Sequence, residues 1–420
     1  MNFTYNQMWI SILLTLASST VTLPLKPLSF SRIPTIKTFT SSSSSTILKV
    51  SNYYNLQYYT SIDIGTPGQA SSLIIDTGSS WTWVPSTNCT CHESPNRFYS
   101  NESSTFTSSG DMIVQYYGMG MISGELFTDK LKASSLSVNN QDMILVYRDK
   151  DLQGLASSGL LGLGFNELSD GKKTVIENMK SQGLIESSKF SVYLNSLNGY
   201  SGVDSAFVIG GIDETFVGGE GFVLNVSKDL GFWILNIGGV RVNENIVAGS
   251  YLGIVDTGTS FLYAPLASFN VIFEELSKYG SILLDSDGFR YFECIESDIG
   301  LMPDLWISIE GKEFRISAKN YLFYENSTCY LFVEENDGDY WLLGQVFIRE
   351  YYILFDMDLV QITLYPVNGE MGKQVNIVEG MVSSQGMAIS LGVFALGVCY
   401  WTRKNRVNEK TAFDYTYLGN

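Results

Sequence analysis

The sequence predicts an all-β protein built from two related lobes. Two nearly identical stretches, "IIDTGSSWTWVP" at 74–85 and "IVDTGTSFLYAP" at 254–265, place their aspartates 180 positions apart. Each is followed by a Leu-Leu-Gly element, whose glycine lies 86 residues after the first aspartate and 88 residues after the second. Short apolar runs broken by Gly, Ser and Asn dominate elsewhere, which favours strands. Two sequence elements that recur in the same order and at nearly the same spacing indicate two duplicated lobes.

The amino-acid composition limits the possible functions of the protein. The chain has 420 residues, 45% of them hydrophobic, which is enough for a large packed core. Its formal net charge of -17 would repel nucleic acid, so we expect no nucleic-acid partner. The acidity either suits an acidic lumen or only keeps the protein soluble. His92 is the single histidine, which nearly excludes Ser-His triads and His-rich metal sites.

The N-terminus indicates secretion. Residues 9–17, "WISILLTLA", form the short apolar core of a signal peptide over 1–20. An uncleaved anchor is the alternative, but nine residues are too few to span a membrane. A basic stretch without acidic residues and a serine run follow within 21–48. We favour a short pro-segment that docks on the acidic body over a disordered terminus with no role.

Sequons and cysteines also favour the secretory pathway. The five cysteines fit an oxidising compartment. Cys294 and Cys329 are the most plausible structural disulfide, and Cys399 lies apart in the C-terminal apolar stretch. A bond between Cys89 and Cys91, which only one residue separates, would be strained and is doubtful. N-x-[ST] sequons that predict a lumenal glycoprotein occur at Asn88, Asn101, Asn225 and Asn326.

Strand patterns begin at Val50, where "YYTSIDIGTP" alternates and ends in a Gly-Thr-Pro turn. Two segments have helical patterns. The first covers 174–182 and stops at Gly183, and the second covers 268–279 and stops at Gly280. The apolar face of the second helix comprises Phe269, Ile272, Phe273 and Leu276.

Each D-T-G element is suited to hold one carboxylate. Two apolar residues precede each aspartate, so each aspartate should end a buried strand. The glycine permits a tight turn with its N–H near the carboxylate, and a hydroxyl follows. A single D-T-G is more often only a turn, and the phosphoryl-transfer motif D-K-T-G-T is excluded by the missing lysine. Two copies in matched contexts favour a catalytic role. The supporting residues are Thr77, Gly78, Ser79, Thr257, Gly258 and Thr259.

The catalytic candidates are Asp76 and Asp256. If two loops bring their carboxylates to roughly 3 Å, two negative charges repel by about 5 kcal/mol at an effective dielectric of about 20. The pair should therefore keep one proton. One carboxylate is then a general base that deprotonates water, and the other is a general acid. This chemistry needs no metal, cofactor or covalent nucleophile.

From these residues the chain resembles the pepsin-like aspartic proteases, which include pepsin and cathepsin D. The resemblance covers 54–367 and includes "DIGTP", "DTGSS", "WVPS", "YYGMGMISG", "GLLGLGF", "FSVYLN", "IGGID", "IVDTGTS" and "WLLGQVFIREYYILFD". It implies a bilobal fold, with lobes at 49–212 and 213–367 and a cleft between them for protein and peptide substrates. Asp76 and Asp256 match the catalytic pair, which in this family shares one proton. We expect a monomer.

The resemblance also assigns supporting roles. Thr77 and Thr257 match residues that brace the two loops, and Ser79 and Thr259 match hydroxyls that orient the carboxylates. The flap, a hairpin that closes over substrate, corresponds to "YYGMGMISG". Its tyrosine is Tyr117, unless that residue is merely an aromatic in a strand.

Further matches concern substrate binding. Gly118 and Met119 should form the flap tip, and Trp83 should hydrogen-bond Tyr117. Met119 and Met121 would make the pockets adaptable. The apolar pocket residues, which imply a preference for bulky hydrophobic groups around the scissile bond, are Ile74, Leu160, Ile254 and Leu342.

The chain departs from the family in several places. Gln345 stands where many acid-active members carry Asp, which predicts a less acidic pH optimum. The pair Cys89 and Cys91 encloses a shorter loop than the family's first-lobe disulfide, whereas Cys294 and Cys329 match a second-lobe disulfide. Lys37 is the candidate lysine of the pro-segment that blocks the dyad.

About fifty residues follow the protease-like region. Residues 380–402 carry no charge, and Arg403-Lys404-Asn405-Arg406 comes next. We predict a stalk at 368–380, a membrane helix at 381–402 and a cytosolic tail at 403–420, hence a single-pass type I protein with a lumenal catalytic domain. An apolar helix docked on a soluble domain is the alternative. The tail segment 415–418 has the form of an endosomal or lysosomal sorting signal. A catalytically silent protein that binds peptides or a partner is the competing function.

Overall fold

The computed structural model describes residues 45–367, except 92, 93, 95, 119, 153, 197–204, 286 and 287. The predicted signal peptide, most of the pro-segment, the stalk, the membrane helix and the tail therefore lie outside the described residues. Within the described residues, no helix is both long and apolar enough to cross a membrane. Strands dominate this part of the chain, which confirms the predicted all-β class.

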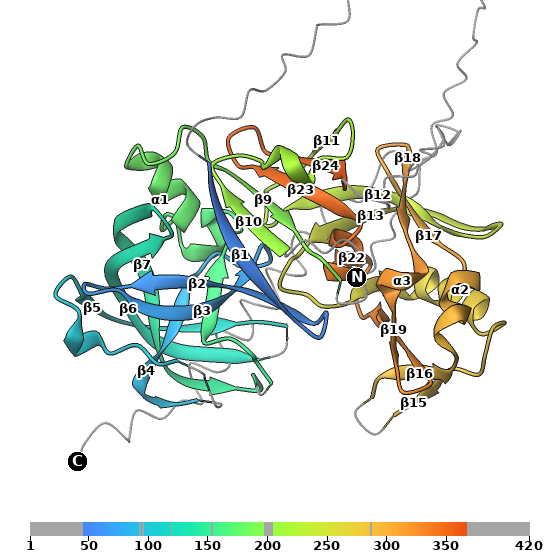
Figure 1. The fold of residues 1–420 in the computed structure, drawn as a ribbon, viewed down its shortest axis with the longest axis horizontal. Coiled ribbons are helices and arrows are strands. Elements are labelled where there is room, and N and C mark those ends of the chain that lie inside the picture. Colours follow the sequence, from blue (N-terminus) through green and yellow to red (C-terminus); the bar gives the residue numbers. More distant parts are fainter. Residues whose placement is uncertain are drawn as a thin grey trace, which may run out of the picture. The chain divides into compact units, whose positions relative to one another are not determined.

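The largest sheet has thirteen strands (Figure 1). Its order is β11-β24-β23-β9-β10-β1-β2-β3-β8-β4-β7-β6-β5, and β2 also pairs with β6. Strands from both ends of the described chain therefore meet in one sheet, which joins the lobes. Its strands are β1 (Thr46–Tyr53), β2 (Gln57–Ile64), β3 (Gln69–Asp76), β4 (Trp83–Thr90), β5 (Thr107–Tyr116), β6 (Met121–Ala133), β7 (Leu136–Lys150), β8 (Gly159–Gly162), β9 (Lys189–Tyr193), β10 (Ser205–Ile209), β11 (Phe222–Asn225), β23 (Tyr351–Asp356) and β24 (Gln361–Pro366).

Two smaller sheets belong to the second lobe. The seven-stranded sheet has the order β18-β17-β12-β13-β22-β14-β21, and the four-stranded sheet has the order β15-β16-β20-β19. The former contains β12 (Ile234–Val242), β13 (Asn245–Val255), β14 (Leu262–Pro265), β17 (Leu305–Ile309), β18 (Lys312–Ile316), β21 (Val333–Asn336) and β22 (Tyr340–Leu343). The latter contains β15 (Leu283–Leu284), β16 (Arg290–Glu293), β19 (Leu322–Glu325) and β20 (Thr328–Leu331).

The internal repeat is visible in the strand register. The order β3-β8-β4-β7 in the first lobe corresponds to β13-β22-β14-β21 in the second. Each Leu-Leu-Gly element forms a strand parallel to the strand that carries the aspartate, with Ile75 opposite Leu161 and Val255 opposite Leu343. The duplication predicted from the sequence offsets is therefore also a duplication of the strand order and of the strand register.

Helices are short in the described part of the chain: α1 (Val175–Ser181), α2 (Leu266–Leu276), α3 (Ala318–Tyr321) and α4 (Gln345–Ile348). The predicted first helix is confirmed as α1. Thr174 caps it through a capping box with Glu177, and Gly183 adopts a positive φ just beyond it. The second prediction was shifted, because α2 starts two residues earlier and ends three residues earlier than expected. Its predicted apolar face is buried at Phe269, Ile272 and Leu276 and half-buried at Phe273.

The first strand also begins earlier than predicted. β1 starts at Thr46 instead of Val50 because residues 46–50 pair with β10. Strand pairing of this kind depends on a partner more than a hundred residues away, which local alternation does not show. Strand β1 therefore begins inside 21–48, the segment predicted as pro-segment and linker.

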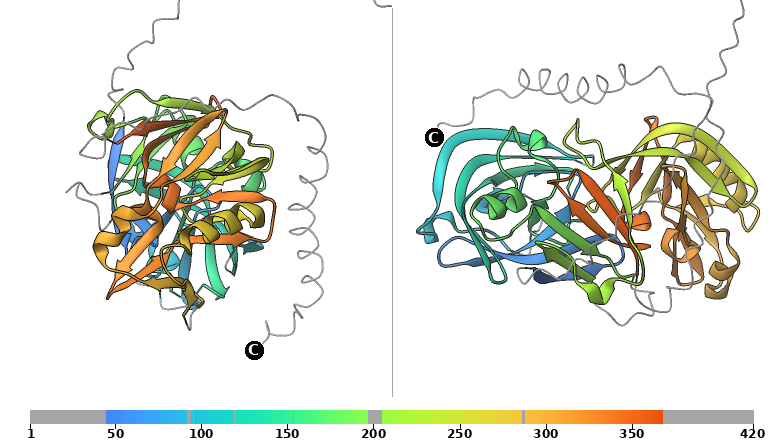
Figure 2. Two further views of the ribbon diagram at one scale, coloured as in Figure 1. Left: turned by 90° about the vertical axis from the view of Figure 1, so that its right-hand side faces the viewer. Right: turned by 90° about the horizontal axis from the view of Figure 1, so that it is seen from above.

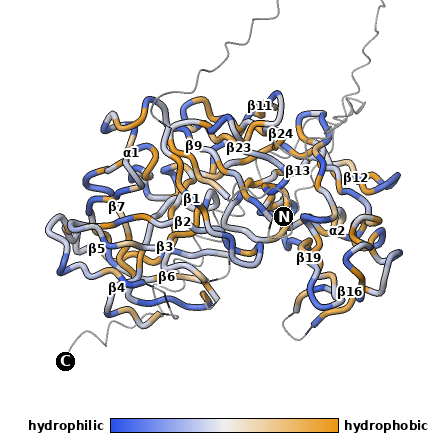
Figure 3. Tube along the Cα trace, viewed as in Figure 1, coloured by the Kyte–Doolittle hydropathy of each residue, from blue (hydrophilic) through white to orange (hydrophobic). Residues whose placement is uncertain are grey.

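Aromatic side chains fill the core where the lobes join. Phe355 of β23 stacks on Phe190 of β9 at 4.8 Å between ring centroids and contacts Trp233 at 5.0 Å. Trp233 also donates a hydrogen bond to the carbonyl of Leu163, two residues before Phe165, which packs on its ring. Figure 2 shows the sheets from two further sides, and Figure 3 shows hydrophobic stretches along the strands. This packing fixes the first-lobe segment that supports the candidate site.

Candidate active site

Both predicted aspartates lie where a buried strand turns. Asp76 is the last residue of β3, and Asp256 directly follows β13. The backbone N–H of Leu163 donates to the carbonyl of Asp76 at 2.8 Å, and the N–H of Asp256 donates to the carbonyl of Leu343 at 3.1 Å. Each aspartate is therefore tied to the Leu-Leu-Gly segment of its own lobe.

The two carboxylates accept matching sets of hydrogen bonds. Asp76 Oδ1 accepts from the N–H of Gly78 at 2.9 Å, and Oδ2 accepts from the hydroxyl of Ser79. Asp256 Oδ1 accepts from the N–H of Gly258 at 2.8 Å, and Oδ2 accepts from Thr259 Oγ1 at 2.6 Å. The hydroxyls expected to orient the carboxylates thus contact them.

Two threonines link the loops reciprocally. Thr77 N–H donates to Thr257 Oγ1 and Thr257 N–H donates to Thr77 Oγ1, each at 2.9 Å. Thr77 Oγ1 donates to the carbonyl of Val255 at 2.8 Å, and Thr257 Oγ1 donates to that of Ile75 at 2.7 Å. Both threonines are fully buried. These four bonds fix the position of one loop against the other.

The glycines let the loops approach. A Cβ at Gly78 would lie 2.5 Å from the carboxylate of Asp256, and one at Gly258 would overlap the carboxylate of Asp76. Since real Cβ atoms do not come this close, any larger residue would push the aspartates apart. The structure therefore brings the two predicted catalytic side chains and their supporting residues together.

The surroundings of the two carboxylates differ. Asp76 is 5% exposed, whereas Asp256 is partly exposed. Burial and the negative charge of Asp256 raise the pKa of Asp76 well above its usual value, although the hydrogen bonds from Ser79 and Gly78 oppose this shift. A carboxyl in this setting retains its proton under conditions in which an exposed aspartate is ionised.

The predicted pocket residues form two matched pairs beside the dyad. Ile74 lies opposite Leu160 across β3 and β8, and Ile254 lies opposite Leu342 across β13 and β22. The first pair is buried, and the second is partly exposed. Ile74 and Leu160 share an apolar cluster with Trp83, and Tyr117 packs against it.

The predicted hairpin is present. β5 and β6 pair antiparallel up to Tyr116 opposite Met121, and the N–H of Tyr117 donates to the carbonyl of Gly120 at 2.7 Å. Gly118 is exposed at the turn, while Met119 lies outside the described residues. Tyr116 and Tyr117 therefore lie at the end of a hairpin whose outer strand, β5, is an edge of its sheet.

The expected hydrogen bond from Trp83 to Tyr117 is not formed. Tyr117 Oη and Trp83 Nε1 are both buried without a hydrogen-bond partner among the described residues. Burial and the charge of Asp76 raise the pKa of Tyr117 well above its usual value, and the nearby indole of Trp83 partly opposes the shift. The hydroxyl of Tyr117 and the indole of Trp83 thus lie near each other and near the dyad, but they are not oriented to form the expected hydrogen bond.

Gln345 connects the second loop to α4. Its Nε2 donates to the carbonyl of Thr257 at 2.9 Å, and its N–H donates to that of Thr259 at 2.8 Å. The side chain is fully buried, and its Oε1 has no partner within the described part of the chain. An uncharged amide therefore braces the Asp256 loop where a carboxylate would add a negative charge.

Sequence reasoning missed three residues that position the site. Ser80 and Ser260, the second hydroxyl after each D-T-G, donate to the carbonyls of Phe165 and Leu56 at 2.6 and 2.5 Å. Their repetition in both stretches was an available signal. Arg349, just after α4, is buried and joins the lobes through the carbonyls of Asn55 and Asn320. No local pattern identifies an arginine of this kind.

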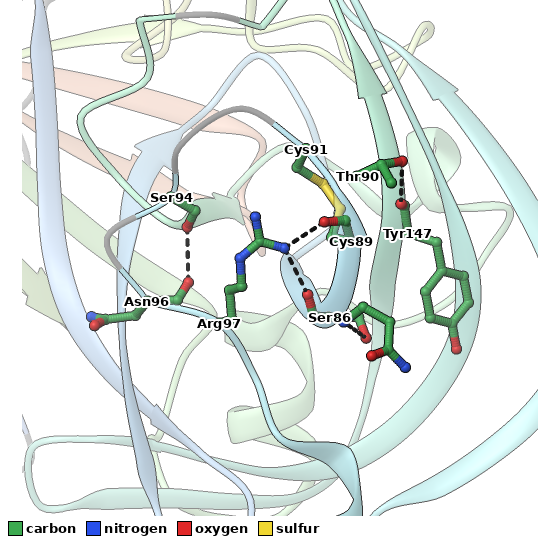
Figure 4. Close-up of a disulfide and its surroundings, with 9 residues drawn as sticks. Ser86, Cys89, Thr90, Cys91, Ser94, Asn96, Arg97 and Tyr147 are labelled. Atoms are coloured by element: carbon green, nitrogen blue, oxygen red, sulfur yellow. Dashed lines mark hydrogen bonds between the residues drawn. A yellow bond between two sulfur atoms is a disulfide. The ribbon is translucent and has the colours of Figure 1, made fainter.

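Two disulfides are formed in the described residues. Cys294 and Cys329 pair with an S–S distance of 2.02 Å, which confirms the prediction. Cys89 and Cys91 are also bonded, contrary to the doubt raised by their spacing (Figure 4). Backbone atoms at the two ends of this short ring lie 5.2 Å apart at Cα, within the range that a disulfide spans. The four sequon asparagines, Asn88, Asn101, Asn225 and Asn326, have exposed side chains.

The fold and the paired D-T-G loops define the class of protein. A family model described as eukaryotic aspartyl protease matches residues 57–367, and the chain belongs to this family. It is 36% identical to pepsin A of Gallus gallus over 332 residues, which cover 76% of this chain and 86% of that protein.

Other relatives are similarly distant. Rhizopuspepsin-2 of Rhizopus niveus is 33% identical over 78% of this chain and 85% of its own length. Cathepsin D of Dictyostelium discoideum is 31% identical over 76% of this chain and 85% of its own length. The chain is thus an aspartic endopeptidase of the pepsin-like class, as the sequence predicted.

Proposed function

We propose that this endopeptidase hydrolyses peptide bonds of proteins by activating a water between Asp76 and Asp256. The observation that carries the proposal is the reciprocal bonding of Thr77 and Thr257, which holds the two carboxylate loops together. Such fixed positioning of two carboxyls with different surroundings is what general acid–base catalysis requires.

The difference in burial supports different roles for the two aspartates. Asp76, whose pKa is raised by burial and by Asp256, holds the proton of the pair and donates it to the scissile carbonyl oxygen. Asp256, the more exposed partner, accepts a proton from the water, which attacks the carbonyl carbon. When the tetrahedral intermediate collapses, Asp256 gives this proton to the nitrogen of the leaving amine, and a hydroxyl of the intermediate returns a proton to Asp76. All charge development occurs beside fixed N–H and hydroxyl donors.

We propose that the hairpin ending at Tyr117 acts as a flap. Its tyrosine hydroxyl and the indole N–H of Trp83 are buried and have no hydrogen-bond partner in the part of the chain that the structure describes, so both can donate to a substrate group or an ordered water when the flap closes. Ile74 and Leu160, with Ile254 and Leu342, would form the pockets on the two sides of the scissile bond. Because all four are aliphatic, we expect a preference for bulky hydrophobic residues.

The amide at Gln345 suggests a less acidic pH optimum than that of members with Asp at this position. It braces Thr257 without adding a titratable charge beside the dyad. We expect the maximum of kcat/KM to lie above about pH 3, since no carboxylate at this position must be protonated for the site to function. An optimum below about pH 3 would contradict this assignment.

We further propose that the catalytic domain is lumenal, glycosylated and tethered by residues 381–402. The exposed side chains of the four sequon asparagines and the two disulfides support passage through an oxidising secretory compartment. Membrane extraction tests the anchor: alkaline carbonate should leave the full chain in the pellet, and deletion of 381–402 should release it. A full chain that is extracted by carbonate would contradict the tether.

Peptide cleavage tests the proposed function. The purified chain should cleave a denatured protein substrate between about pH 3 and pH 7, mostly beside bulky hydrophobic residues, and should bind pepstatin. Asp76→Asn should remain folded and inactive. If the wild-type protein cleaves nothing in this range and does not bind pepstatin, the silent peptide-binding alternative is favoured.

A further inference from the structure

We propose that the Cys89–Cys91 disulfide is a thiol-exchange site, which a small dithiol opens in the folded protein while Cys294–Cys329 stays closed. The proposal does not depend on the peptidase mechanism. It rests on the accessibility of the first disulfide, on its place in the strand ladder and on a neighbouring cation.

The two disulfides differ in exposure. Cys91 is partly exposed, so an external thiolate can reach its sulfur. In the second disulfide, Cys294 is 8% exposed and Cys329 is fully buried. Because exchange requires direct attack of a thiolate on sulfur, access alone favours the first bond.

The two disulfides also differ in what holds them. Cys329 lies in the ladder of β20 opposite Phe292 of β16, and the N–H of Cys294 donates to the carbonyl of Ser327. Cys89, in contrast, lies in a bulge. β4 pairs with β7 up to Pro85 and resumes only at Thr90, so residues 86–89 make no ladder contact with β7. Opening the first bond therefore breaks no pairing between these strands.

Ring size points the same way. Cys89 and Cys91 are two positions apart in the sequence, whereas Cys294 and Cys329 are 35 apart. A crosslink that closes a short loop removes little freedom from the chain, so the chain loses little when it opens. After opening, the two thiols remain only two positions apart in the chain and can close again.

Arg97 places a positive charge beside the first disulfide (Figure 4). Its Nη1 donates to the carbonyl of Cys89 at 2.6 Å and to that of Ser86 at 3.3 Å. A nearby guanidinium stabilises a departing thiolate and so favours exchange. The same two hydrogen bonds would keep the bulge in place while the sulfurs are unbonded.

The exchange is a two-electron transfer from a dithiol. One thiolate of the dithiol attacks Sγ of Cys91, and Cys89 leaves as a thiolate. The second sulfur of the dithiol then attacks its own mixed disulfide and releases Cys91. The dithiol is oxidised to a disulfide, and the Cys89–Cys91 disulfide is reduced to two cysteines. The two protons of the dithiol finish on the cysteine sulfurs at acidic or neutral pH.

The site is connected to the candidate pocket. Cys89 is buried at the end of the strand that begins with Trp83, and both belong to one apolar cluster with Ile74 and Leu160. Opening the disulfide should therefore loosen the end of β4 behind the flap tyrosine, without reaching the second lobe.

Differential alkylation tests the proposal. The folded, glycosylated Asp76→Asn chain, in which self-cleavage cannot interfere, is treated with dithiothreitol at neutral pH and then with iodoacetamide. Mass spectrometry then quantifies each cysteine. We expect Cys89 and Cys91 to be labelled at least about tenfold faster than Cys294 and Cys329, which serve as the internal control. Hydrogen exchange should increase in the peptide that covers β4 and stay unchanged in the peptide that covers β13.

Matched variants separate exchange from unfolding. Arg97→Gln should slow the labelling of Cys89 and Cys91, and Cys89→Ser/Cys91→Ser should abolish the response of the β4 peptide to the dithiol. Equal labelling rates for the two disulfides, or labelling of Cys89 and Cys91 only after denaturation, would overturn the proposal.

Discussion

The loops at 76–79 and 256–259 have the same hydrogen-bonding plan in different surroundings. In each, a glycine N–H and a hydroxyl bond the carboxylate, and a threonine crosses to the other lobe. Yet Asp76 is buried near Tyr117 of the hairpin, while Asp256 is partly exposed and braced by the amide of Gln345. A duplicated scaffold can thus place two identical groups symmetrically and still give them different surroundings.

The largest expected effect comes from the carboxylates themselves. Asp76→Asn and Asp256→Asn should each lower kcat by about 10³-fold or more, because each removes one partner of a general acid–base pair. Steady-state assays on a hydrophobic peptide would measure the loss. The matched control is Asp129→Asn, a buried aspartate of β6 outside the dyad, which should retain activity if the variant folds. Retained activity in either dyad variant would contradict the claim that catalysis needs both carboxylates.

The two threonines that link the loops, Thr77 and Thr257, should contribute nearly equally to stability. Thr77→Val or Thr257→Val removes two buried hydrogen bonds and leaves an N–H and a carbonyl without partners. We expect a loss of about 2–4 kcal/mol in the free energy of unfolding for each. Denaturant melts would show this, with the exposed Thr107→Val as a control that changes by less than about 0.5 kcal/mol. If the double variant lost the full sum of both effects, the brace would not be a coupled unit.

The flap tyrosine should affect catalysis and not folding. Tyr117→Phe removes a buried hydroxyl that has no hydrogen-bond partner among the described residues, so stability should be unchanged or slightly higher. The kcat/KM value should fall about tenfold, which corresponds to one hydrogen bond made only with substrate. Tyr263→Phe is the second-lobe control, since Tyr263 lies opposite Leu342 as Trp83 lies opposite Leu160. Equal losses in both variants would remove the functional difference between the lobes.

The smallest effect concerns stability and pH. Because the pKa of Asp76 is raised in the folded state, the native protein binds more protons than the unfolded chain between the ordinary and the raised value. Its contribution to stability is therefore greatest in acid and is lost as the pH rises through this window. Asp76→Asn should melt at a higher temperature than wild type at about pH 7 and at the same temperature below about pH 3. Calorimetry at both pH values measures the difference, and a variant that is less stable at neutral pH would contradict the assignment.

Much of the site followed from the sequence because it is made of local, repeated elements. The D-T-G loops, the Leu-Leu-Gly segments and the hairpin at Tyr117 each carry turn chemistry within a few residues, and the register of Ile75 and Val255 bears out their duplication. Contacts between distant segments did not follow. The pairing of residues 46–50 with β10, and the lobe-joining Arg349, depend on partners that no local pattern encodes.

The structure also differed from expectation at two places where the orientation of side chains decides whether a bond forms. Cys89 and Cys91 are bonded with their Cα atoms 5.2 Å apart, which their spacing alone did not indicate. Trp83 and Tyr117 lie close together, as expected, but within the described residues neither the indole N–H nor the tyrosine hydroxyl has a hydrogen-bond partner.

Titration of the aspartate carboxyls tests the central claim most directly. Carbon-13 NMR of the protein labelled at the aspartate side-chain carboxyls would follow each group from about pH 3 to pH 7 in wild type, Asp76→Asn and Asp256→Asn. We predict one carboxyl that stays protonated above the range of an ordinary aspartate, is absent in Asp76→Asn, and ionises at lower pH in Asp256→Asn because the repelling charge is gone. If all aspartates ionise in the ordinary range, or if the protonated carboxyl persists in Asp76→Asn, the account of an unequal dyad is wrong.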